Sequence, residues 1–361
     1  MSPFSMRRFS AYIFLALFTV FAAQIRAELI WTPGDGWKIE GGALSGLVGS
    51  DARNALELMN KARAAEEAGK RRTALRAYKK VTKVYGNSIY SPEAYYRTAH
   101  LRLQGRQYYK AFEAFQRIMT LYPNTDRFNE VLGEQYRIAE DLMNGARNYY
   151  FGIIPAFRSR ERAITYFEWV VANAPYSDYA PLALMNVAKT HQRLDNTPYA
   201  IDALDRLINN YAQSLLAPDA YLELAKTHAS LVDGPLYDQE STREAITYFE
   251  DYMILFSEDE GLAEAQQGLD EMRTVFAESK MILGDYTMKY NKNLRGARVF
   301  YNEAITSFPN SAVAARAREK LDIIDAREAE LGISSDNDAD AARRANTPAP
   351  KPKRKKFLGI F

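Results

Sequence analysis

The feature of this sequence that most constrains its fold is a pattern of apolar residues that recurs six times. Each copy has an alanine, a large and usually aromatic residue four positions later, and another apolar residue three positions after that, so all three share one helix face. In three copies, a small residue also stands twelve positions before the alanine, on a preceding helix. The copies begin at Ala74, Ala111, Ala163, Ala200, Ala245 and Ala297. The pattern predicts a series of paired helices that cross closely at small side chains.

Residues 91–125 are the clearest copy and show how one pair is delimited. Ser91 is a good helix N-cap, and Pro92 suits the first helical position, where an N–H would have no partner. Gly105 lies in the break between two helices, and Pro123 ends the second helix because it disfavours helical geometry in the residue before it. One pair leaves an apolar face uncovered, so such pairs are stable only when they stack. Longer gaps before the third and fifth copies predict inserted loops at 148–159 and 232–241.

The pattern resembles the tetratricopeptide repeat, in which small residues mark the crossing of paired helices and an aromatic residue fills the second helix. The resemblance covers residues 51–331. It implies an all-α fold, a right-handed solenoid of five to six helix pairs closed by a C-terminal capping helix over 313–331. Before it, residues 28–50 are rich in glycine and contain Trp31 and Trp37. We expect this stretch to be extended and to lie on the first helices, with contact to a partner or membrane as the alternative.

The start of the chain differs from this body. Residues 1–27 combine Arg7 and Arg8 with an apolar run over 11–23 and small residues up to Ala27, which is typical of a secretory signal peptide. Cleavage is expected after Ala27, or else near Ala22. An anchor helix is the alternative, although the run is shorter than the ~20 residues needed to span a bilayer. The sequence therefore predicts an exported, periplasmic protein.

The other end, residues 332–361, has no apolar periodicity and predicts a disordered basic tail that ends in an apolar pentapeptide. A cluster of cations followed by apolar residues suits an anionic membrane surface, where each cation contributes about 1 kcal/mol. Peripheral attachment to the outer membrane is one interpretation and a solvated terminus is the other. The residues expected to make the contact are Lys351, Lys353, Arg354, Lys355, Lys356, Phe357 and Phe361.

Several kinds of chemistry are missing from the sequence. There is no cysteine, which excludes disulfides, thiolate metal sites and cysteine nucleophiles. The three histidines lie in separate helices, and no phosphate-binding loop, zinc-binding helix or nucleophile elbow occurs. Without residues 1–27 and 343–361 the chain has 37 basic against 45 acidic residues, which disfavours nucleic-acid binding. We expect no enzyme activity, cofactor or metal; a helical-repeat hydrolase with paired carboxylates is the alternative.

The groove lined by the first helix of each pair is the candidate binding site. Aromatic and methionine side chains interspersed with cations suit a peptide that has apolar side chains and a negative charge or free carboxylate. Some of these residues, especially the tyrosines, could instead pack only against the next repeat. Counting from the small crossing residue, the groove positions are Met59, Arg63, Tyr96, His100, Tyr136, Met185, Lys189, Arg193 and Lys226.

Three segments also resemble the BamD-like family of outer-membrane β-barrel assembly factors: SPEAYYRTA, AITYFEWVVANAPYSDYA and ARVFYNEAITSFPNS. The resemblance implies a non-enzymatic scaffold whose N-terminal repeats bind C-terminal segments of unfolded barrel proteins, and whose C-terminal repeats hold the barrel-shaped insertase. Members of that family usually carry a lipidated cysteine after the signal peptide, and this chain has none. The alternative is a generic periplasmic repeat scaffold for cell-envelope or division machinery.

Overall fold

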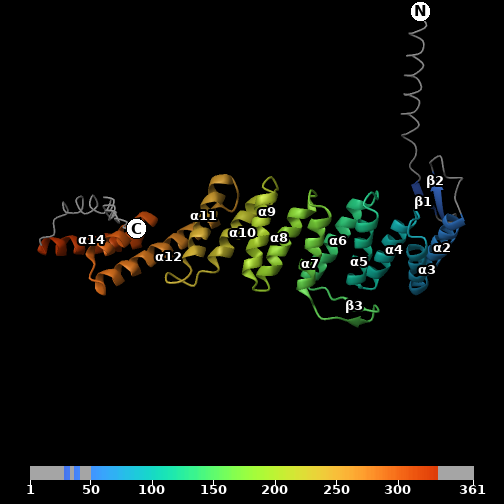
Figure 1. The fold of residues 1–361 in the computed structure, drawn as a ribbon, viewed down its shortest axis with the longest axis horizontal. Coiled ribbons are helices and arrows are strands. Elements are labelled where there is room, and N and C mark those ends of the chain that lie inside the picture. Colours follow the sequence, from blue (N-terminus) through green and yellow to red (C-terminus); the bar gives the residue numbers. More distant parts are fainter. Residues whose placement is uncertain (1–27, 33–35, 41–49, 332–361) are drawn as a thin grey trace, which may run out of the picture. The chain divides into compact units, whose positions relative to one another are not determined.

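The computed structural model describes residues 28–32, 36–40 and 50–331 of the chain (Figure 1). The predicted signal peptide at 1–27, residues 41–49, and the tail with its proposed membrane-contact residues Lys351 to Phe361 lie outside the described residues. The described residues divide into two compact units, and the second begins at Ala217.

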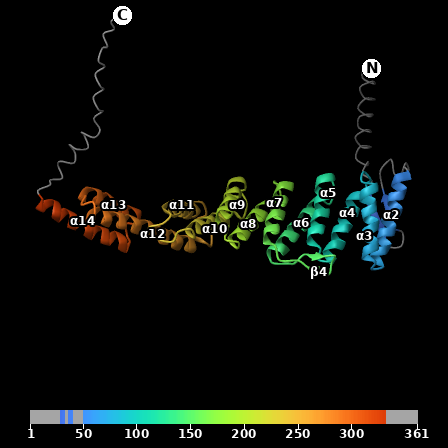
Figure 2. The same ribbon diagram turned by 60° about the horizontal axis from the view of Figure 1, so that its bottom comes forward.

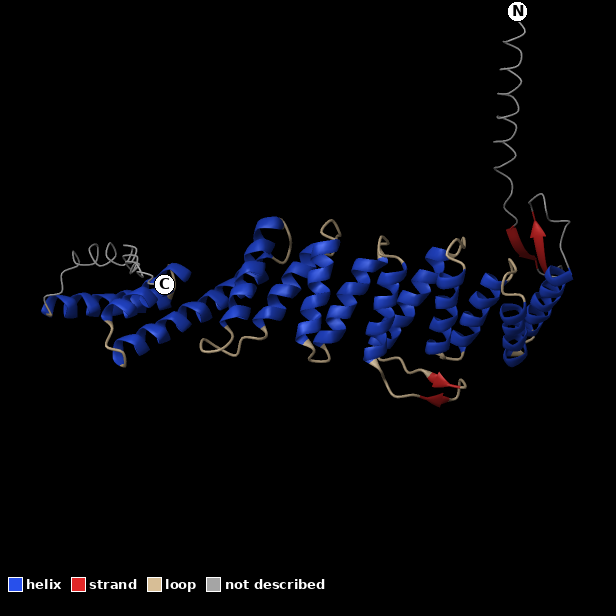
Figure 3. Ribbon diagram, viewed as in Figure 1, coloured by secondary structure: helices blue, strands red, loops and turns tan. Residues whose placement is uncertain are grey.

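The fold is an all-α repeat solenoid, as the sequence predicts, with thirteen helices in the described residues (Figure 3). In unit 1 they form four pairs: α2 (Ser50–Glu67) with α3 (Arg71–Val84), α4 (Ser91–Gln104) with α5 (Tyr108–Leu121), α6 (Phe128–Met143) with α7 (Arg160–Asn173), and α8 (Tyr179–Gln192) with α9 (Thr197–Asn210). In unit 2 they form two pairs and a last helix: α10 (Ala217–Ala229) with α11 (Gln239–Leu255), α12 (Leu262–Lys289) with α13 (Leu294–Ser307), and α14 (Ala312–Glu330).

The core consists of the residues that the repeat pattern singles out. All six pattern alanines are fully buried, and so are Tyr78, Phe115 and Phe167 at the aromatic position. Small residues on the preceding helices, such as Ala62, are equally buried. Full burial of one such ring removes enough apolar surface from water to stabilise the fold by about 2–3 kcal/mol. The six pairs are thus built on one repeated arrangement of small and aromatic side chains.

In unit 1 the helices form two faces, which can be followed in Figure 2. First helices contact first helices, as where the ring of Tyr136 on α6 lies 5.4 Å from that of Tyr179 on α8. Second helices contact second helices, as where Phe112 on α5 stacks on Tyr166 of α7 at 3.7 Å. We call these the first-helix face and the second-helix face.

Helix α12 is longer than a repeat helix and carries two close contacts. A Cβ atom at Gly268 would lie 2.3 Å from the Phe249 ring of α11, and one at Gly284 would lie 2.6 Å from the Tyr301 ring of α13. Both distances are too short for any side chain, so glycine lets α12 approach the helix on either side. One continuous helix therefore packs against both the preceding and the following second helix.

Two short strand pairs accompany the helices of unit 1. Strands β1 (Glu28–Thr32) and β2 (Gly36–Glu40) form an antiparallel hairpin in the stretch expected to be extended. Strands β3 (Tyr149–Tyr150) and β4 (Ile154–Pro155) form another within the insertion between α6 and α7, which the sequence analysis described only as a loop. The second insertion, before α11, has no strand or helix over 230–238, and Asp238 caps α11 by accepting a hydrogen bond from the Ser241 amide at 2.9 Å.

The aromatic residue that ends a second helix ties neighbouring repeats together at their turns. The Tyr122 hydroxyl donates to the carbonyl oxygen of Gly86 at 2.6 Å, and the Tyr211 hydroxyl donates to that of Pro175 at 2.7 Å. Each bond reaches back 36 residues, to the corresponding turn of the preceding repeat. The aromatic turn signal of the sequence is therefore an inter-repeat bond as well as a helix stop.

We expect Tyr122→Phe and Tyr211→Phe each to lower the free energy of unfolding by about 1 kcal/mol, the net contribution of one hydrogen bond, because only the hydroxyl is lost. Urea denaturation followed by circular dichroism measures this. Tyr176→Phe is the matched control, since that side chain is fully exposed in a turn of the same edge. Equal stability of all three variants would show that the turn bonds contribute nothing.

Candidate functional site

The first-helix face of unit 1 begins with a continuous ladder of charges. Arg63 on α2 pairs with Glu66 and Glu67, both at 3.2 Å, and Glu66 is 3.8 Å from Arg97 on α4. Glu93 on α4 pairs with Arg97 at 2.9 Å and with Arg127 at 3.0 Å. Arg127 also pairs with Glu130 of α6 at 2.8 Å. We call this set the charge ladder: Arg63, Glu66, Glu67, Glu93, Arg97, Arg127 and Glu130. It joins the first helices of three consecutive pairs and satisfies their charges internally.

The β1–β2 hairpin covers the start of this ladder. The Trp37 amide donates to the side-chain oxygen of Asn60 on α2 at 2.7 Å, and the Trp37 ring is almost completely buried. The Arg63 guanidinium lies 4.3 Å from the centroid of the Trp31 ring, and Arg97 lies 5.8 Å from that of Trp37, in cation–π geometry. Both tryptophans therefore dock on this chain's own first-helix face. Arg63, a predicted groove residue, is enclosed by its two glutamates and Trp31.

Tyr96 and His100 were the predicted groove residues of the clearest repeat, and the structure places both against neighbouring side chains. The Tyr96 hydroxyl donates to Glu130 of the next pair, and the Arg127 guanidinium lies 4.5 Å from the centroid of the tyrosine ring. Burial and then the bond to Glu130 raise the pKa of Tyr96. His100 packs edge-on against Phe115 with centroids 5.6 Å apart, and burial lowers its pKa. Of the two interpretations left open for Tyr96, packing against the next repeat is the one that the structure shows.

Two of the predicted groove residues belong to the core. Met59 is fully buried and packs with the alanines of α2 and α3, while Met185 on α8 is 3% exposed. The spacing argument placed them three positions before the crossing alanine, on the side expected to face a ligand. In these two repeats that position is buried in the core. Assigning Met59 and Met185 to a groove was therefore wrong.

The open part of the first-helix face lies on α8. Tyr136 of α6 accepts a hydrogen bond from Asn186 at 2.8 Å, and burial raises the pKa of the tyrosine. Asn186 shares its side of the helix with the residues four positions before it and three and seven positions after it. All three of these side chains are exposed: Leu182, Lys189 and Arg193. We call Leu182, Asn186, Lys189 and Arg193 the α8 stripe. The predicted groove residues Tyr136, Lys189 and Arg193 thus lie together, beside an exposed leucine that the prediction did not include.

Lys226, the remaining predicted groove residue, belongs to unit 2 and forms ion pairs there. Its ammonium group lies 2.6 Å from Glu264 of α12 and 3.4 Å from Glu223 of its own helix. This pair of contacts ties the first helix α10 to the first helix α12. Lys226 is therefore a link between repeats, as Arg97 and Arg127 are in unit 1.

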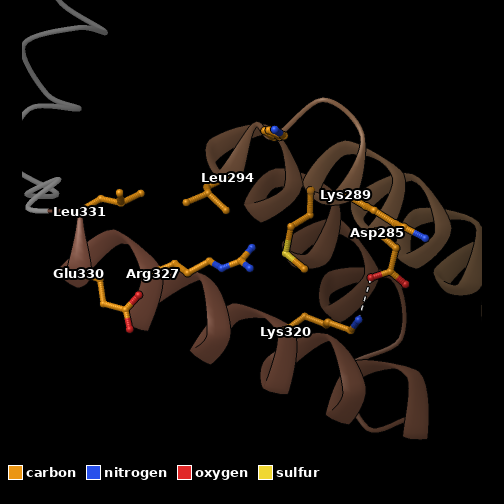
Figure 4. A pocket seen from close by; sticks show the side chains of 9 residues that line it. Asp285, Lys289, Leu294, Lys320, Arg327, Glu330 and Leu331 are labelled. Carbon is orange, nitrogen blue, oxygen red and sulfur yellow. Dashed lines mark ion pairs between the residues drawn. The ribbon is translucent and has the colours of Figure 1, made fainter.

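Unit 2 has a hollow of about 900 Å³ between α12 and α14, which sequence reasoning missed (Figure 4). Lys320 pairs with Asp285 at 3.0 Å, and the Tyr301 hydroxyl donates to the same carboxylate at 2.7 Å. The other cations make no ion pair within the described part of the chain. We call this site the unit 2 hollow; its lining residues are Asp285, Met288, Lys289, Lys292, Leu294, Lys320, Arg327, Glu330 and Leu331.

The hollow is cationic with an apolar wall. Four of its lining residues are basic and two are acidic, and Met288, Leu294 and Leu331 supply apolar surface. In Figure 4 the Arg327 side chain extends from α14 into the space between the helices. A signal for this site was present in the sequence, because Lys320 and Arg327 are seven residues apart and so share one face of the last helix. The sequence pattern of that helix predicted only a cap.

The described residues give no indication of metal chemistry or of a membrane span. Among 28–32, 36–40 and 50–331, no group of three or more histidine, aspartate or glutamate side chains could hold a metal ion. No helix in these ranges combines the length and the apolar character that crossing a bilayer requires.

Comparison with known proteins agrees with the repeat geometry. A sequence model of the tetratricopeptide repeat matches residues 58–88, 93–125 and 182–214, which fall on the first, second and fourth helix pairs. The chain contains tetratricopeptide repeats in these residues. No curated protein matches it in sequence.

Solved structures similar to this chain are distant. A tetratricopeptide repeat protein from Parabacteroides merdae is 13% identical over 75% of this chain and 99% of its own, with a TM-score of 0.30. PilW, described as a widely conserved type IV pilus biogenesis factor, is 16% identical over 74% of this chain and 98% of its own, at 0.25. MamA from Desulfovibrio magneticus is 15% identical over 59% and 99%, at 0.28. Likeness at this level carries no functional argument.

The charge ladder makes a direct prediction about stability. Glu93 is almost buried and holds two arginines, so Glu93→Gln leaves both without their shared partner. We expect a loss of about 3 kcal/mol in the free energy of unfolding, as for other broken buried pairs. Glu67→Gln, at the half-exposed end of the ladder, should cost less than about 1 kcal/mol. Denaturant titration of both variants measures the difference, and equal small losses would mean that the ladder is an ordinary surface feature.

Proposed function

We propose that this protein is a non-enzymatic scaffold of the periplasm that binds protein segments at two surfaces, one in each unit. The observation that carries the proposal is the distribution of free charge. The arginines of the charge ladder are all paired with its glutamates and partly covered, whereas the α8 stripe and the unit 2 hollow keep exposed cations beside apolar side chains.

The chemistry of each surface suits an extended peptide. Lys189 and Arg193 are one helical turn apart, and Leu182 lies two turns before Lys189 on the same side of α8. A peptide running along the helix can place an apolar side chain on Leu182 and a carboxylate on the cations. The unit 2 hollow offers the same two kinds of group, with Arg327 able to take a carboxylate in bidentate geometry.

The resemblance to the BamD-like assembly factors supports a specific version of this role. A C-terminal segment of an unfolded barrel protein ends in a free carboxylate, which the α8 stripe in the N-terminal unit can bind. The unit 2 hollow then receives a segment of the insertase. The alternative partners, division or other cell-envelope proteins, would use the same surfaces with different side chains.

Charge reversal tests the proposal. Lys189→Glu/Arg193→Glu should weaken binding of a fluorescent peptide with an apolar residue and a free C-terminal carboxylate by at least about tenfold, since two favourable charges become unfavourable. Fluorescence anisotropy measures the affinity, and an amidated peptide should already bind more weakly to the unchanged chain. Lys79→Glu/Lys83→Glu on α3 is the matched control, with the same spacing on exposed positions.

The identity of the partners needs a second measurement. Mild crosslinking in cells followed by purification of the exported chain should recover a barrel-shaped outer-membrane insertase, and Lys292→Glu/Arg327→Glu should lose it. Recovery of only cell-wall or division proteins would contradict the assembly-factor role and support the alternative scaffold.

A further inference from the structure

The insertion between α6 and α7 exposes several large apolar side chains that are not part of the buried core. Phe157 is 94% exposed and Phe151 is 75% exposed, although both belong to a segment held in place by strands β3 and β4. We call the five large apolar residues of this insertion that are exposed the hairpin tip: Tyr150, Phe151, Ile153, Ile154 and Phe157. A compact exposed apolar group of this kind marks an interaction site.

The hairpin is anchored firmly to the turn between α4 and α5. The Tyr149 amide donates to the Arg106 carbonyl at 2.8 Å, and the Tyr109 amide donates to the side-chain oxygen of Asn148 at 3.2 Å. Asn148 is buried, and the Ala156 amide donates to its carbonyl at 2.7 Å, which closes the base of the insertion. The tip is therefore presented on a fixed support, beyond the helix ends of unit 1 (Figure 3).

The backbone at the tip is also unfavourable for its sequence. Phe151 has a φ of 56°, in the left-handed region that a bulky aromatic residue rarely adopts, and Gly152 follows with a φ of 76°. Asparagine or glycine would adopt this conformation more easily than phenylalanine. A strained position that holds an exposed aromatic ring suggests selection for contact rather than for stability.

The surroundings of the tip are strongly basic. A Cβ atom at Gly152 would lie 2.9 Å from the Arg71 guanidinium, and the ammonium group of Lys110 lies 5.8 Å from the Phe151 ring centroid. The hairpin therefore lies beside Arg71 at the start of α3 and beside the turn that precedes Lys110, and three stretches of the chain meet here. These stretches, residues 69–72, 102–110 and 145–162, contain ten lysines and arginines and one acidic residue, Glu161. We call them the basic edge. The remaining turn of this edge, 193–196, adds one residue of each sign.

The opposite edge of unit 1 has no such excess. Its turns, residues 85–90, 122–127, 174–178 and 211–216, contain one basic and two acidic residues. The Tyr122 and Tyr211 bonds described above connect these turns to one another. The two edges of unit 1, formed by opposite ends of its helices, therefore differ in charge. Among the described residues of unit 1, cations and exposed apolar side chains are combined at one edge only.

We propose that the β3–β4 hairpin inserts its tip into an anionic phospholipid bilayer, with the basic edge resting on the lipid phosphates. Apolar side chains that enter the boundary of the acyl chains, surrounded by cations at head-group level, are the combination that binds such surfaces. A protein groove would match the apolar tip but not ten cations spread over three turns, and a nucleic acid would match the cations but not the aliphatic tip. The hairpin tip and the basic edge share no residue with the α8 stripe, and the proposal does not depend on the proposed peptide binding.

The absence of cysteine allows a direct test with the full chain. A single cysteine replaces Phe157, or in the control Tyr176 at the opposite edge, and carries an environment-sensitive fluorophore. When vesicles of phosphatidylcholine containing one third phosphatidylglycerol are added, the fluorescence of the probe at position 157 should rise several-fold. A quencher placed in the acyl region of the bilayer should then quench it. Emission at position 176 should not change, and pure phosphatidylcholine should have little effect. Because the probe is local, attachment through either terminus does not imitate the result.

Two variants separate insertion from folding. Phe151→Asn should weaken the vesicle response several-fold while the unfolding temperature stays equal or rises, because the backbone strain is relieved. Arg158→Gln/Arg160→Gln should weaken vesicle affinity about thirtyfold, since each cation near an anionic surface contributes about fivefold; Lys79→Gln/Lys83→Gln is the control. A probe at 157 that stays in water while the chain binds vesicles would overturn the proposal. So would an equal response to phosphatidylcholine alone, or to an RNA oligonucleotide.

Discussion

The close approach of paired helices at small residues is the constraint on which this structure depends. Where a Cβ atom is absent altogether, at Gly268 and Gly284, the facing rings of Phe249 and Tyr301 occupy its place. The buried alanines of the other pairs serve the same purpose with one methyl group each. Close packing of this kind leaves no room for larger side chains, so it fixes the helix spacing in every repeat. The surface features of unit 1 described above follow from which side chains that spacing brings to its two faces and two edges.

The sequence predicted the fold well because this constraint is local and periodic. An alanine and a large apolar residue four positions later, aromatic in five of the six copies, determine the helices, their pairing and the core. The sequence did not identify α12 as one long helix, because Gly268 and Gly284 allow close packing there and do not break the helix as glycines often do. It also described residues 148–159 only as an inserted loop, because the hairpin is stabilised by Asn148 and Tyr149 through bonds to the distant α4–α5 turn.

The candidate site was harder to predict, and the reason is visible in individual residues. Position in the repeat says which way a side chain points, but not what lies opposite it. Met59 is buried in the core with the alanines of α2 and α3, while Tyr96 reaches the next pair and bonds Glu130. Within the described residues, Lys189 and Arg193 make no ion pair, and both side chains are exposed. Whether a groove position is available depends on contacts between repeats, which the sequence of one repeat does not contain.

The most direct test of this account asks which part of the first-helix face meets a partner. A photoreactive phenylalanine placed at Leu182, in the α8 stripe, or at Trp31, over Arg63, is activated in growing cells and the products are separated by mass. We expect adducts with another protein from position 182, and only links within the chain from position 31. Partner adducts from position 31, with none from 182, would show that the covered part of the face is the binding site and would contradict the account.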